Sequence, residues 1–310
     1  MVRNVITITL NPTVDKSSSV DRITPEKKLR CEQPKFEPGG GGINVSRGLS
    51  RLGIASTAFF PSGGRTGKLL EELLAKENVT TAPLPVSGET RENFIVVESS
   101  TNNQFRFGMP GAGITTDEQD AIYSAIHALD PFPDLAVISG SMPPGVDSAF
   151  LRKLLRSFKE KGSRVILDTS GNALSEAIEE GPFLLKPNIG ELARLSGVES
   201  LDNDSADEAA RELIMQGRAE VIVVSMGPHG AYLITKDETH HISAPAVKKL
   251  STVGAGDSMV AGMVSVLASE GSYVDMARMG VACGSAATMN PGTGLFKKDD
   301  AERLFKWLSR

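Results

Sequence analysis

Residues 135–168 read LAVISGSMPPGVDSAFLRKLLRSFKEKGSRVILD, and this stretch indicates the fold class. It begins with a short apolar run at Leu135–Ser139 and ends with another at Arg164–Asp168, both of which predict buried strands. Between them, 147–161 has the apolar spacing of an amphipathic helix. A strand, a helix and a strand in this order predict parallel neighbours joined by a crossover helix.

The same alternation continues on both sides of this unit. Further elements are expected as helices near 117–129, 173–180, 189–196 and 205–217 and strands at Phe183–Lys186 and Glu220–Ser225. Towards the N-terminus we expect a strand at Val5–Leu10 and helices at Ile43–Leu52 and Lys68–Glu77. After strands near 230–244, the chain is expected to be helical from 257 onward. The pattern predicts one doubly wound α/β domain over 1–310, with a mostly parallel sheet covered by helices on both faces.

Two segments break this alternation. Residues 14–37 and 91–109 contain extended, alternating pieces without helical patterns, and Ser99–Asn103 has the composition of a hairpin turn. We expect the two segments to form a small antiparallel β unit, a lid that leaves the main sheet and returns to it. The alternative is that they are edge strands of the main sheet.

Composition excludes several classes of protein. The net charge of -5 argues against nucleic-acid binding, which usually needs a basic face. The two cysteines, Cys31 and Cys283, form no CxxC unit, so neither a zinc site nor a disulfide framework is expected. No segment approaches the ~18 consecutive apolar residues of a membrane span, and the N-terminal segment has a strand pattern rather than that of a signal peptide. A cytoplasmic protein with no membrane partner is expected.

Residues 251–258, STVGAGDS, predict a phosphate site with a carboxylate beside it. Gly254 and Gly256 leave backbone N–H groups uncovered, and a helix starting there adds the positive end of its dipole. A phosphate would repel Asp257, so a carboxylate in an anion site suggests a base that takes a proton from an attacking hydroxyl. The alternative is that Asp257 simply caps the helix.

A second glycine-rich loop precedes the helix at Ile43–Leu52. Four successive glycines, Gly39–Gly42, imply positive φ angles or the close approach of a ligand to the backbone. Asn44, in the first helical turn, can offer a donor and an acceptor to a sugar hydroxyl. Neither glycine loop matches a P-loop or the GxGxxG of a dinucleotide fold, so a nucleotide-dependent dehydrogenase is a poor match.

Polar residues also follow two of the expected strands. Asn188 and Glu191, three residues apart after Lys186-Pro187, suit a magnesium ion held largely through water; alternatively, they form the capping box of a helix. Strand Val221–Ser225 leads into the glycine-rich turn Met226–Gly230, a place for nucleotide contacts at the carboxyl end of a parallel strand. The lid would place cations and a carboxylate opposite the glycine loops, at Lys27, Lys28, Arg30, Arg91 and Asp15. The alternative is that each of these cations is a solvated surface charge.

These motifs together resemble the ribokinase-like (PfkB) family of carbohydrate kinases, essentially from end to end. The resemblance rests on Asn-Pro-x-x-Asp after the first strand, GGGGINVSR at 39–47, KPNIGE at 186–191, VVSMGPHG at 223–230 and TVGAGDS at 252–258. Within the family, the chain is most similar to the ATP-dependent 6-phosphofructokinases. This similarity rests on KLRC at 28–31, on ISGSMPPGV at 138–146 and on a glycine rather than a lysine at Gly41.

The resemblance implies a role for each matching residue. Asp257 would be the base, and the backbone amides of Gly254, Ala255 and Gly256 would form the anion hole. Sugar hydroxyls would be held by Asp15, Gly39, Gly40, Gly41, Gly42, Asn44 and Ser141, and the sugar phosphate by Arg91 with Lys28 and Arg30 near it. ATP would be held by Lys186, Asn188, Ser225, Gly227, Gly230 and Ser251. Glu191 would organise Mg²⁺, and carbonyl groups at Ser251, Val253, Ala287, Asn290 and Gly292 would bind a monovalent cation such as K⁺.

Two positions depart from the family's pattern. Gly294 stands where a longer, often basic side chain is usual near the cation-binding segment, and Thr24 replaces an aromatic residue of the lid. Cation dependence and any regulatory stacking contact at Thr24 are therefore not carried over.

The resemblance implies ATP-dependent phosphorylation of the C1 hydroxyl of fructose 6-phosphate to fructose 1,6-bisphosphate, a glycolytic reaction. The alternatives are a tagatose 6-phosphate or fructose 1-phosphate kinase of the same fold, and a non-catalytic regulator that binds sugars or nucleotides. The exposed edges of the lid also predict a homodimer formed through it.

Overall fold

The structure, a computed structural model, describes residues 3–202, 205–292 and 294–310. In this part of the chain the larger of two sheets has nine strands in the order β13-β12-β11-β10-β9-β8-β1-β4-β5. The strands are β1 (Val5–Ile8), β4 (Thr57–Ser62), β5 (Thr80–Pro85), β8 (Leu135–Ser139), β9 (Arg164–Asp168), β10 (Leu184–Leu185), β11 (Val221–Ser225), β12 (Ala231–Ile234) and β13 (Thr239–Ile242). From β11 to β5 all neighbours are parallel, whereas β12 and β13 pair antiparallel at one edge. The predicted mostly parallel sheet is confirmed.

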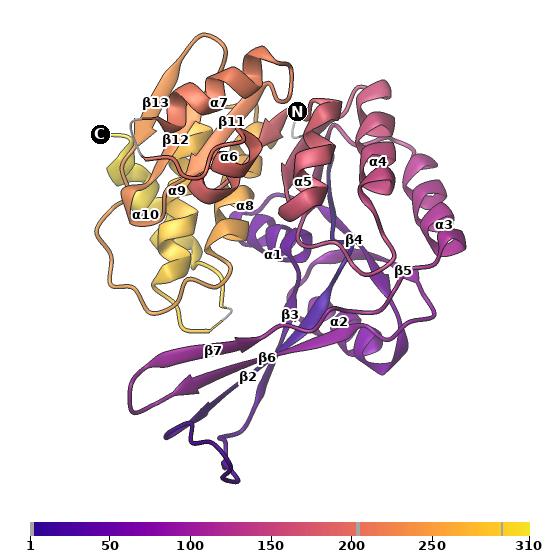
Figure 1. Ribbon diagram of the computed structural model, residues 1–310, viewed down its shortest axis with the longest axis vertical. Helices are drawn as coiled ribbons and strands as arrows, with labels where there is room; N and C mark the ends of the chain where they lie inside the picture. The colour runs from indigo at the N-terminus through magenta and orange to yellow at the C-terminus, as the bar shows by residue number, and fades with distance from the viewer. Residues whose placement is uncertain (1–2, 203–204, 293) are drawn as a thin grey trace.

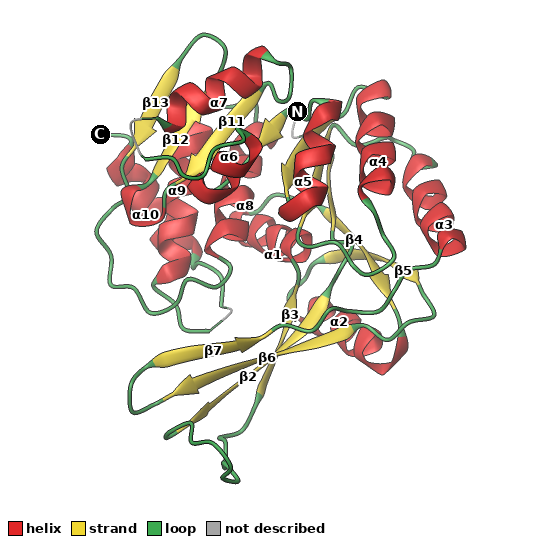
Figure 2. Cartoon of the chain, viewed as in Figure 1, coloured by secondary structure: helices red, strands yellow, loops and turns green. Residues whose placement is uncertain are grey.

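Helices cover both faces of this sheet (Figures 1 and 2). Alternation along β8 shows why: Leu135 and Val137 point into one apolar cluster, and Ala136 and Ile138 into the other. The first face carries α1 (Gly41–Leu52), α8 (Ala255–Ala268), α9 (Tyr273–Thr288) and α10 (Lys298–Leu308). The second carries α3 (Thr116–His127), α4 (Ser148–Glu160), α5 (Gly171–Ala177), α6 (Ile189–Leu195) and α7 (Ala206–Met215). No helix in the described ranges is long and apolar enough to cross a membrane.

The lid is a separate sheet that projects from the body (Figure 1). Its strands are β2 (Thr13–Val20), β3 (Lys35–Gly39), β6 (Arg91–Glu98) and β7 (Asn103–Phe107), in the order β3-β2-β6-β7. The separate sheet is confirmed, and the edge-strand alternative is not what forms. The two outer pairs are antiparallel, as expected, but the central β2–β6 pair is parallel. Strand β2 follows the carboxyl end of β1, and β6 follows the carboxyl end of β5. Because β1 and β5 run in the same direction in the main sheet, β2 and β6 leave it in the same direction.

Some boundaries differ from those expected. Helix α2 (Gly64–Lys76), which packs on β4 and β5, begins four residues before the predicted Lys68. Helix α1 begins inside the glycine run, at Gly41. Both extensions contain glycine, which weakens a helical pattern, and they form because tertiary contacts hold them. The predicted helix 173–180 divides into α5 and a 3₁₀ turn at Ile178–Glu180.

Candidate active site

Asp257 lies in the first turn of α8, close to the lid end of the main sheet. The helix begins after Gly254, whose φ of 71° is left-handed and favours glycine. No side chain caps this helix; instead, Asp257 Oδ2 accepts a hydrogen bond of 2.8 Å from Asn44 Nδ2 on α1. The structure therefore does not use Asp257 as a cap, and it joins the two glycine-rich loops at this carboxylate.

The surroundings of Asp257 favour its protonated form. Burial, followed by the nearby carboxylate of Asp168, raises the pKa of Asp257 to about 6, against the opposing effects of Asn44 and Lys186. A carboxyl group with a pKa near the working pH can both accept and release a proton, as a general base must. The electrostatics thus fit the base expected at this position.

Lys186 brings a positive charge to the same place. Its ammonium lies 3.0 Å from the carboxylate of Asp168 and 3.7 Å from where a Cβ on Gly256 would be. Burial by itself disfavours this ammonium, but nearby carboxylates, led by Asp168, outweigh burial and raise the pKa of Lys186. A charged lysine therefore faces the amides at the start of α8, where an anionic ligand would be bound.

Asp168 is a residue that sequence reasoning missed. It ends β9 and is also within reach of the Ser139 hydroxyl, at 3.3 Å, from the end of β8. Ligands of open α/β sheets bind beyond the carboxyl ends of the strands, so a polar residue that ends a strand was the available signal.

Residues expected to bind the nucleotide make contacts within the protein itself. Asn188 and Glu191 form a reciprocal capping box on α6, with both bonds at 2.9 Å. Ser225 pairs with Asn188 in an isolated parallel bridge, so the ends of β10 and β11 are joined here. At Gly230, a Cβ would lie 1.9 Å from the Ile242 carbonyl oxygen. This glycine is required by the close approach of the β13 strand end, irrespective of any ligand.

The four glycines before α1 also make room for the protein itself. Only Gly40 has a positive φ, at 116°. A Cβ on Gly41 would lie 2.3 Å from Ser139 Oγ, and one on Gly39 would lie 2.6 Å from Asp15 Oδ2. The backbone is closely approached, but by side chains from β8 and β2, and the close approach of a ligand stays a prediction.

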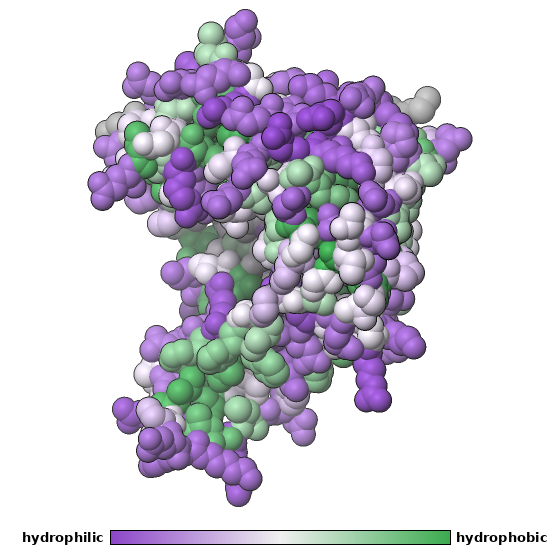
Figure 3. Space-filling model, turned by 45° about the vertical axis from the view of Figure 1, so that its right-hand side comes forward, coloured by the Kyte–Doolittle hydropathy of each residue, from purple (hydrophilic) through white to green (hydrophobic). Residues whose placement is uncertain are grey.

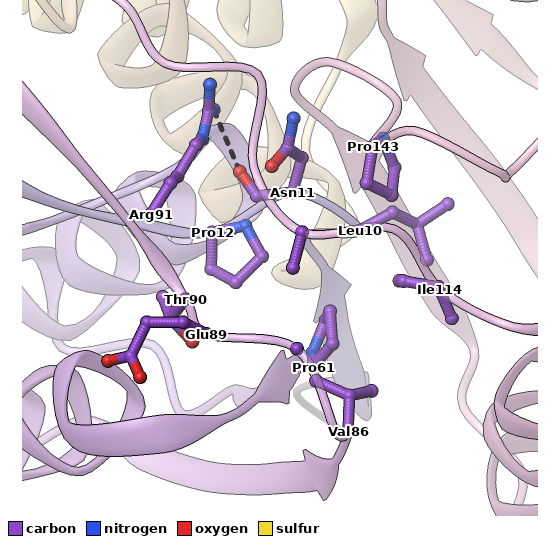
Figure 4. A pocket seen from close by; sticks show the side chains of 12 residues that line it. Leu10, Asn11, Pro12, Pro61, Val86, Glu89, Thr90, Arg91, Ile114 and Pro143 are labelled. Carbon is purple, nitrogen blue, oxygen red and sulfur yellow. Dashed lines mark hydrogen bonds between the residues drawn. The ribbon is translucent and has the colours of Figure 1, made fainter.

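Arg91 meets Asn11 beside a small pocket (Figure 4), and Ser141 contacts the same asparagine. Arg91 donates to the carbonyl oxygens of Asn11 at 2.9 Å and Met109 at 2.7 Å, and the Asn11 amide donates to Ser141 Oγ at 3.2 Å. Arg91 Nε is buried without a partner, and no carboxylate in the described residues pairs with this guanidinium. Burial lowers the pKa of Arg91. The nearby Asp15 carboxylate acts in the opposite direction. Because Nε is enclosed, an anion here would interact with the guanidinium through its charge and its two terminal nitrogens.

Lys28 and Arg30 do not join Arg91 within this chain, contrary to the prediction. Both are exposed in the connection between β2 and β3. Arg91 pairs with Thr13 at the start of β2, whereas the connection leaves after Val20. The intervening seven residues, at about 3.3 Å each, separate the two places by about 23 Å.

The lid also contacts the loop before α8 directly. Arg106 of β7 donates to Thr252 Oγ1 at 3.3 Å, across the recess between lid and body that Figure 3 shows. Asp15 of β2 faces the same recess, where Asn93 donates to it at 3.1 Å and burial raises the pKa of Asp15. Sequence reasoning did not identify Arg106, because alternation along a strand gives its face but not what lies opposite.

Two pairs among the groups expected around a monovalent cation are in hydrogen-bond contact, and the cation site itself stays a prediction. Ser251 Oγ donates to the Gly292 carbonyl at 2.9 Å, and Asn290 N donates to the Ala287 carbonyl at 3.1 Å. The described residues contain no cluster of three or more His, Cys, Asp or Glu that could hold a metal ion. Any cation here would rely on carbonyl oxygens, water or a ligand's own oxygens, which suits K⁺ and Mg²⁺ better than zinc.

Comparisons with known proteins show the family of the chain. A family model described as pfkB family carbohydrate kinase matches residues 5–300. The chain is 44% identical over 311 residues to the ATP-dependent 6-phosphofructokinase isozyme 2 of Escherichia coli (strain K12), with 100% of both chains covered. The crystal structure of phosphofructokinase-2 from Escherichia coli with potassium gives a TM-score of 0.95 at 43% identity, covering 99% of this chain and 100% of that one. The same enzyme with fructose-6-phosphate gives 0.93 at 41%, with the same coverage.

Proposed function

Because the chain belongs to the pfkB family of carbohydrate kinases, we propose that it transfers the terminal phosphoryl group of ATP to the C1 hydroxyl of fructose 6-phosphate. The observation that carries this proposal is the position of Asp257, in an anion-binding helix start and beside the buried Lys186. A pure binding protein has no use for a carboxylate there. Full-length similarity to 6-phosphofructokinases supports the choice of sugar.

Asp257 acts as the base in this proposal. Its carboxylate accepts the proton of the C1 hydroxyl as that oxygen bonds to the transferred phosphorus and the bond to the ADP oxygen breaks. The amides of Gly254, Ala255 and Gly256 and the Lys186 ammonium stabilise the charge on the phosphoryl oxygens. Most of the rate enhancement in such transfers comes from positioning and charge stabilisation rather than covalent chemistry.

The sugar phosphate lies between the lid and the body in this proposal. Asp15 and Asn44 bind hydroxyls, with Gly39–Gly42 shaping the floor of the pocket. Arg91 and Ser141, which meet at Asn11, bind the phosphate. Lys28 and Arg30 of the same chain lie too far from Arg91 to bind this phosphate.

ATP lies along the ends of β10 and β11, near Lys186, Asn188, Ser225, Gly227, Gly230 and Ser251. Magnesium, when bound with ATP, neutralises charge on its phosphates. The oxygens of Glu191, and of Asp168 in addition, suit that ion, because Mg²⁺ keeps much of its water and needs only one or two carboxylates. Carbonyls at Ser251, Val253, Ala287, Asn290 and Gly292 would hold K⁺ behind the anion hole.

A coupled assay with a panel of sugar phosphates tests the substrate. We expect kcat/KM for fructose 6-phosphate to exceed that for tagatose 6-phosphate and fructose 1-phosphate by tenfold or more. A preference for either of the other sugars would reassign the enzyme within its family.

Asp257→Asn tests the base. The variant should lower kcat by about 10²–10⁴ while the fold and ATP binding persist. Turnover within tenfold of the parent would show that Asp257 is not the base.

The lid provides a surface for a second copy of the chain. Four exposed aromatic residues, Phe36, Phe94, Phe105 and Phe107, lie on it, and cross-strand pairing places them on one face. Figure 3 shows apolar residues gathered on the lid with a polar rim. Such a face is self-complementary in a symmetric pair, which supports the homodimer.

We place the enzyme in the cytoplasm, where ATP and sugar phosphates are available and its two free cysteines remain reduced.

A further inference from the structure

A buried arginine lies behind the Asn44–Asp257 hydrogen bond. Arg47, one turn after Asn44 on α1, has only 2% of its side chain exposed. Its Nε and Nη2 form a bidentate pair with Glu77 at the end of α2, at 2.8 and 2.7 Å. Its Nη1 donates to the Pro38 carbonyl at 2.8 Å and to Asn44 Oδ1 at 2.9 Å. The guanidinium is therefore fixed by the end of α2, by β3 and by Asn44 of its own helix.

This contact determines which way the Asn44 amide faces. Arg47 has only donors, so the group directed at it must be the amide oxygen. The amide nitrogen is then left to donate to Asp257. A flipped amide would set donor against donor at Arg47 and acceptor against the ionised carboxylate at Asp257. Two independent partners thus select one orientation of the side chain.

We propose that Arg47, held by Glu77, is a positioning residue that keeps the Asn44 amide donating to the carboxylate of Asp257. The proposal rests on the proposed role of Asp257 as the base. Asn44 held in this way favours the ionised, proton-accepting form. Without Arg47, the amide is free to turn its oxygen towards Asp257 and to accept a hydrogen bond from the protonated acid.

The consequence is a change in pH dependence. The charged groups that face Asp257 are Asp168 from β9, Lys186 after β10 and Asp15 from the lid. None of them is among the hydrogen-bond partners of Arg47, although the charge of Arg47 lowers the pKa of Asp15, an effect that does not pass through Asn44. Arg47→Met should raise the apparent pKa of the acid limb of kcat/KM by about one unit. The phosphate of the substrate titrates identically in every variant, so a shift between variants reports the protein.

Arg51→Met is the matched control. Arg51 lies one turn further along α1 and also approaches Glu77, at 3.8 Å, but its hydrogen bond goes to the Phe296 carbonyl, not to Asn44. It should leave the acid limb in place. Arg47→Met in an Asn44→Ala background should add less than about 0.2 unit, because the effect acts through Asn44. Glu77→Gln, a milder change at a partly exposed site, should shift the limb in the same direction by less.

Several results would overturn the proposal. An acid limb unchanged in Arg47→Met, or an equal shift in the Asn44→Ala background or in Arg51→Met, would show that Arg47 does not act through the amide. If Arg47→Met fails to fold by circular dichroism, an unchanged limb in Glu77→Gln has the same meaning. Failure of the proposed function is seen separately, because Asp257→Asn would then stay active whatever the Arg47 variants do.

Discussion

The environment of Asp257 disfavours its charged form. Its pKa rises from 3.8 to about 6, so between these values the folded protein binds more protons than the unfolded chain. Stability must then fall as pH rises through this window, and above it the full cost is present. A site residue therefore weakens the fold at neutral pH, as expected where function requires a buried charge.

Asp257→Asn removes this cost. We expect the variant to be more stable than the parent by about 2–3 kcal/mol at pH 8, since one pKa unit corresponds to about 1.4 kcal/mol. At pH 4, where the parent carboxyl is protonated when folded, the difference should nearly vanish. Urea unfolding at the two values measures both. Asp299→Asn, at an exposed carboxylate in the first turn of α10, should show little change; equal stability of Asp257→Asn and parent at pH 8 would contradict the environment described.

The roles of single residues were predictable where they depend on neighbours in the sequence. Asp257 was found because a carboxylate in a glycine-rich helix start is chemically unusual, and Asn44 because it follows the glycine run. Asp168 was missed, since its role depends on Lys186 arriving from another strand at 3.0 Å. The predicted position of Lys28 and Arg30 beside Arg91 was wrong. Their positive charge suggests phosphate binding, but only the register of β2 shows how far they lie from Arg91.

At the scale of elements, alternation predicted strands better than helix starts. The bounds of β8 and β9 match the sequence interpretation, because their residues alternate between two buried clusters. The start of α1 at Gly41 was not predicted, since glycine is a poor helix former and contacts with the ends of β1 and β8 hold it there. The parallel pairing of β2 and β6 was also missed, because it follows from the main sheet's topology rather than from either strand.

The start of α6 allows a structural and a functional role to be separated. Asn188 and Glu191 form a capping box, so the observed bonds by themselves need no magnesium. Glutamine at the third helical position satisfies a capping box as glutamate does. Glu191→Gln should therefore leave the thermal midpoint within about 2 °C of the parent. If Glu191 also serves Mg²⁺, the variant should need at least tenfold more Mg²⁺ for half-maximal activity.

The control for this variant is Glu118, which forms the matching capping box of α3, on the far side of the fold from the proposed nucleotide site. Glu118→Gln should keep the parent's magnesium dependence. An unchanged magnesium requirement in Glu191→Gln would reduce Glu191 to its role in the helix cap, and the metal would then have to rely on Asp168, water and the nucleotide.

At the scale of the whole molecule, the lid combines two different faces. The face towards the body carries Asp15 and Arg106, which approach the site. The opposite face carries the row Phe36, Lys16, Phe94 and Phe107, in which the Lys16 ammonium lies 5.2 and 5.4 Å from the centres of the first two rings. Period-two alternation in the sequence predicts such two-faced strands, but the separation of this sheet from the main one shows which face is left uncovered.

Phe107→Glu tests whether a second copy covers this face. Phe107 is 50% exposed, so a charge there should not disturb the fold of the single chain, but it would be buried unpaired against a partner's apolar face. We expect the parent to sediment as a dimer at micromolar concentration and the variant as a monomer, in analytical ultracentrifugation. Met215→Glu, at a residue on α7 that is 66% exposed and distant from the lid, should remain dimeric. A dimer unaffected by Phe107→Glu would mean that the chains associate through another surface, and that the aromatic row has a different occupant.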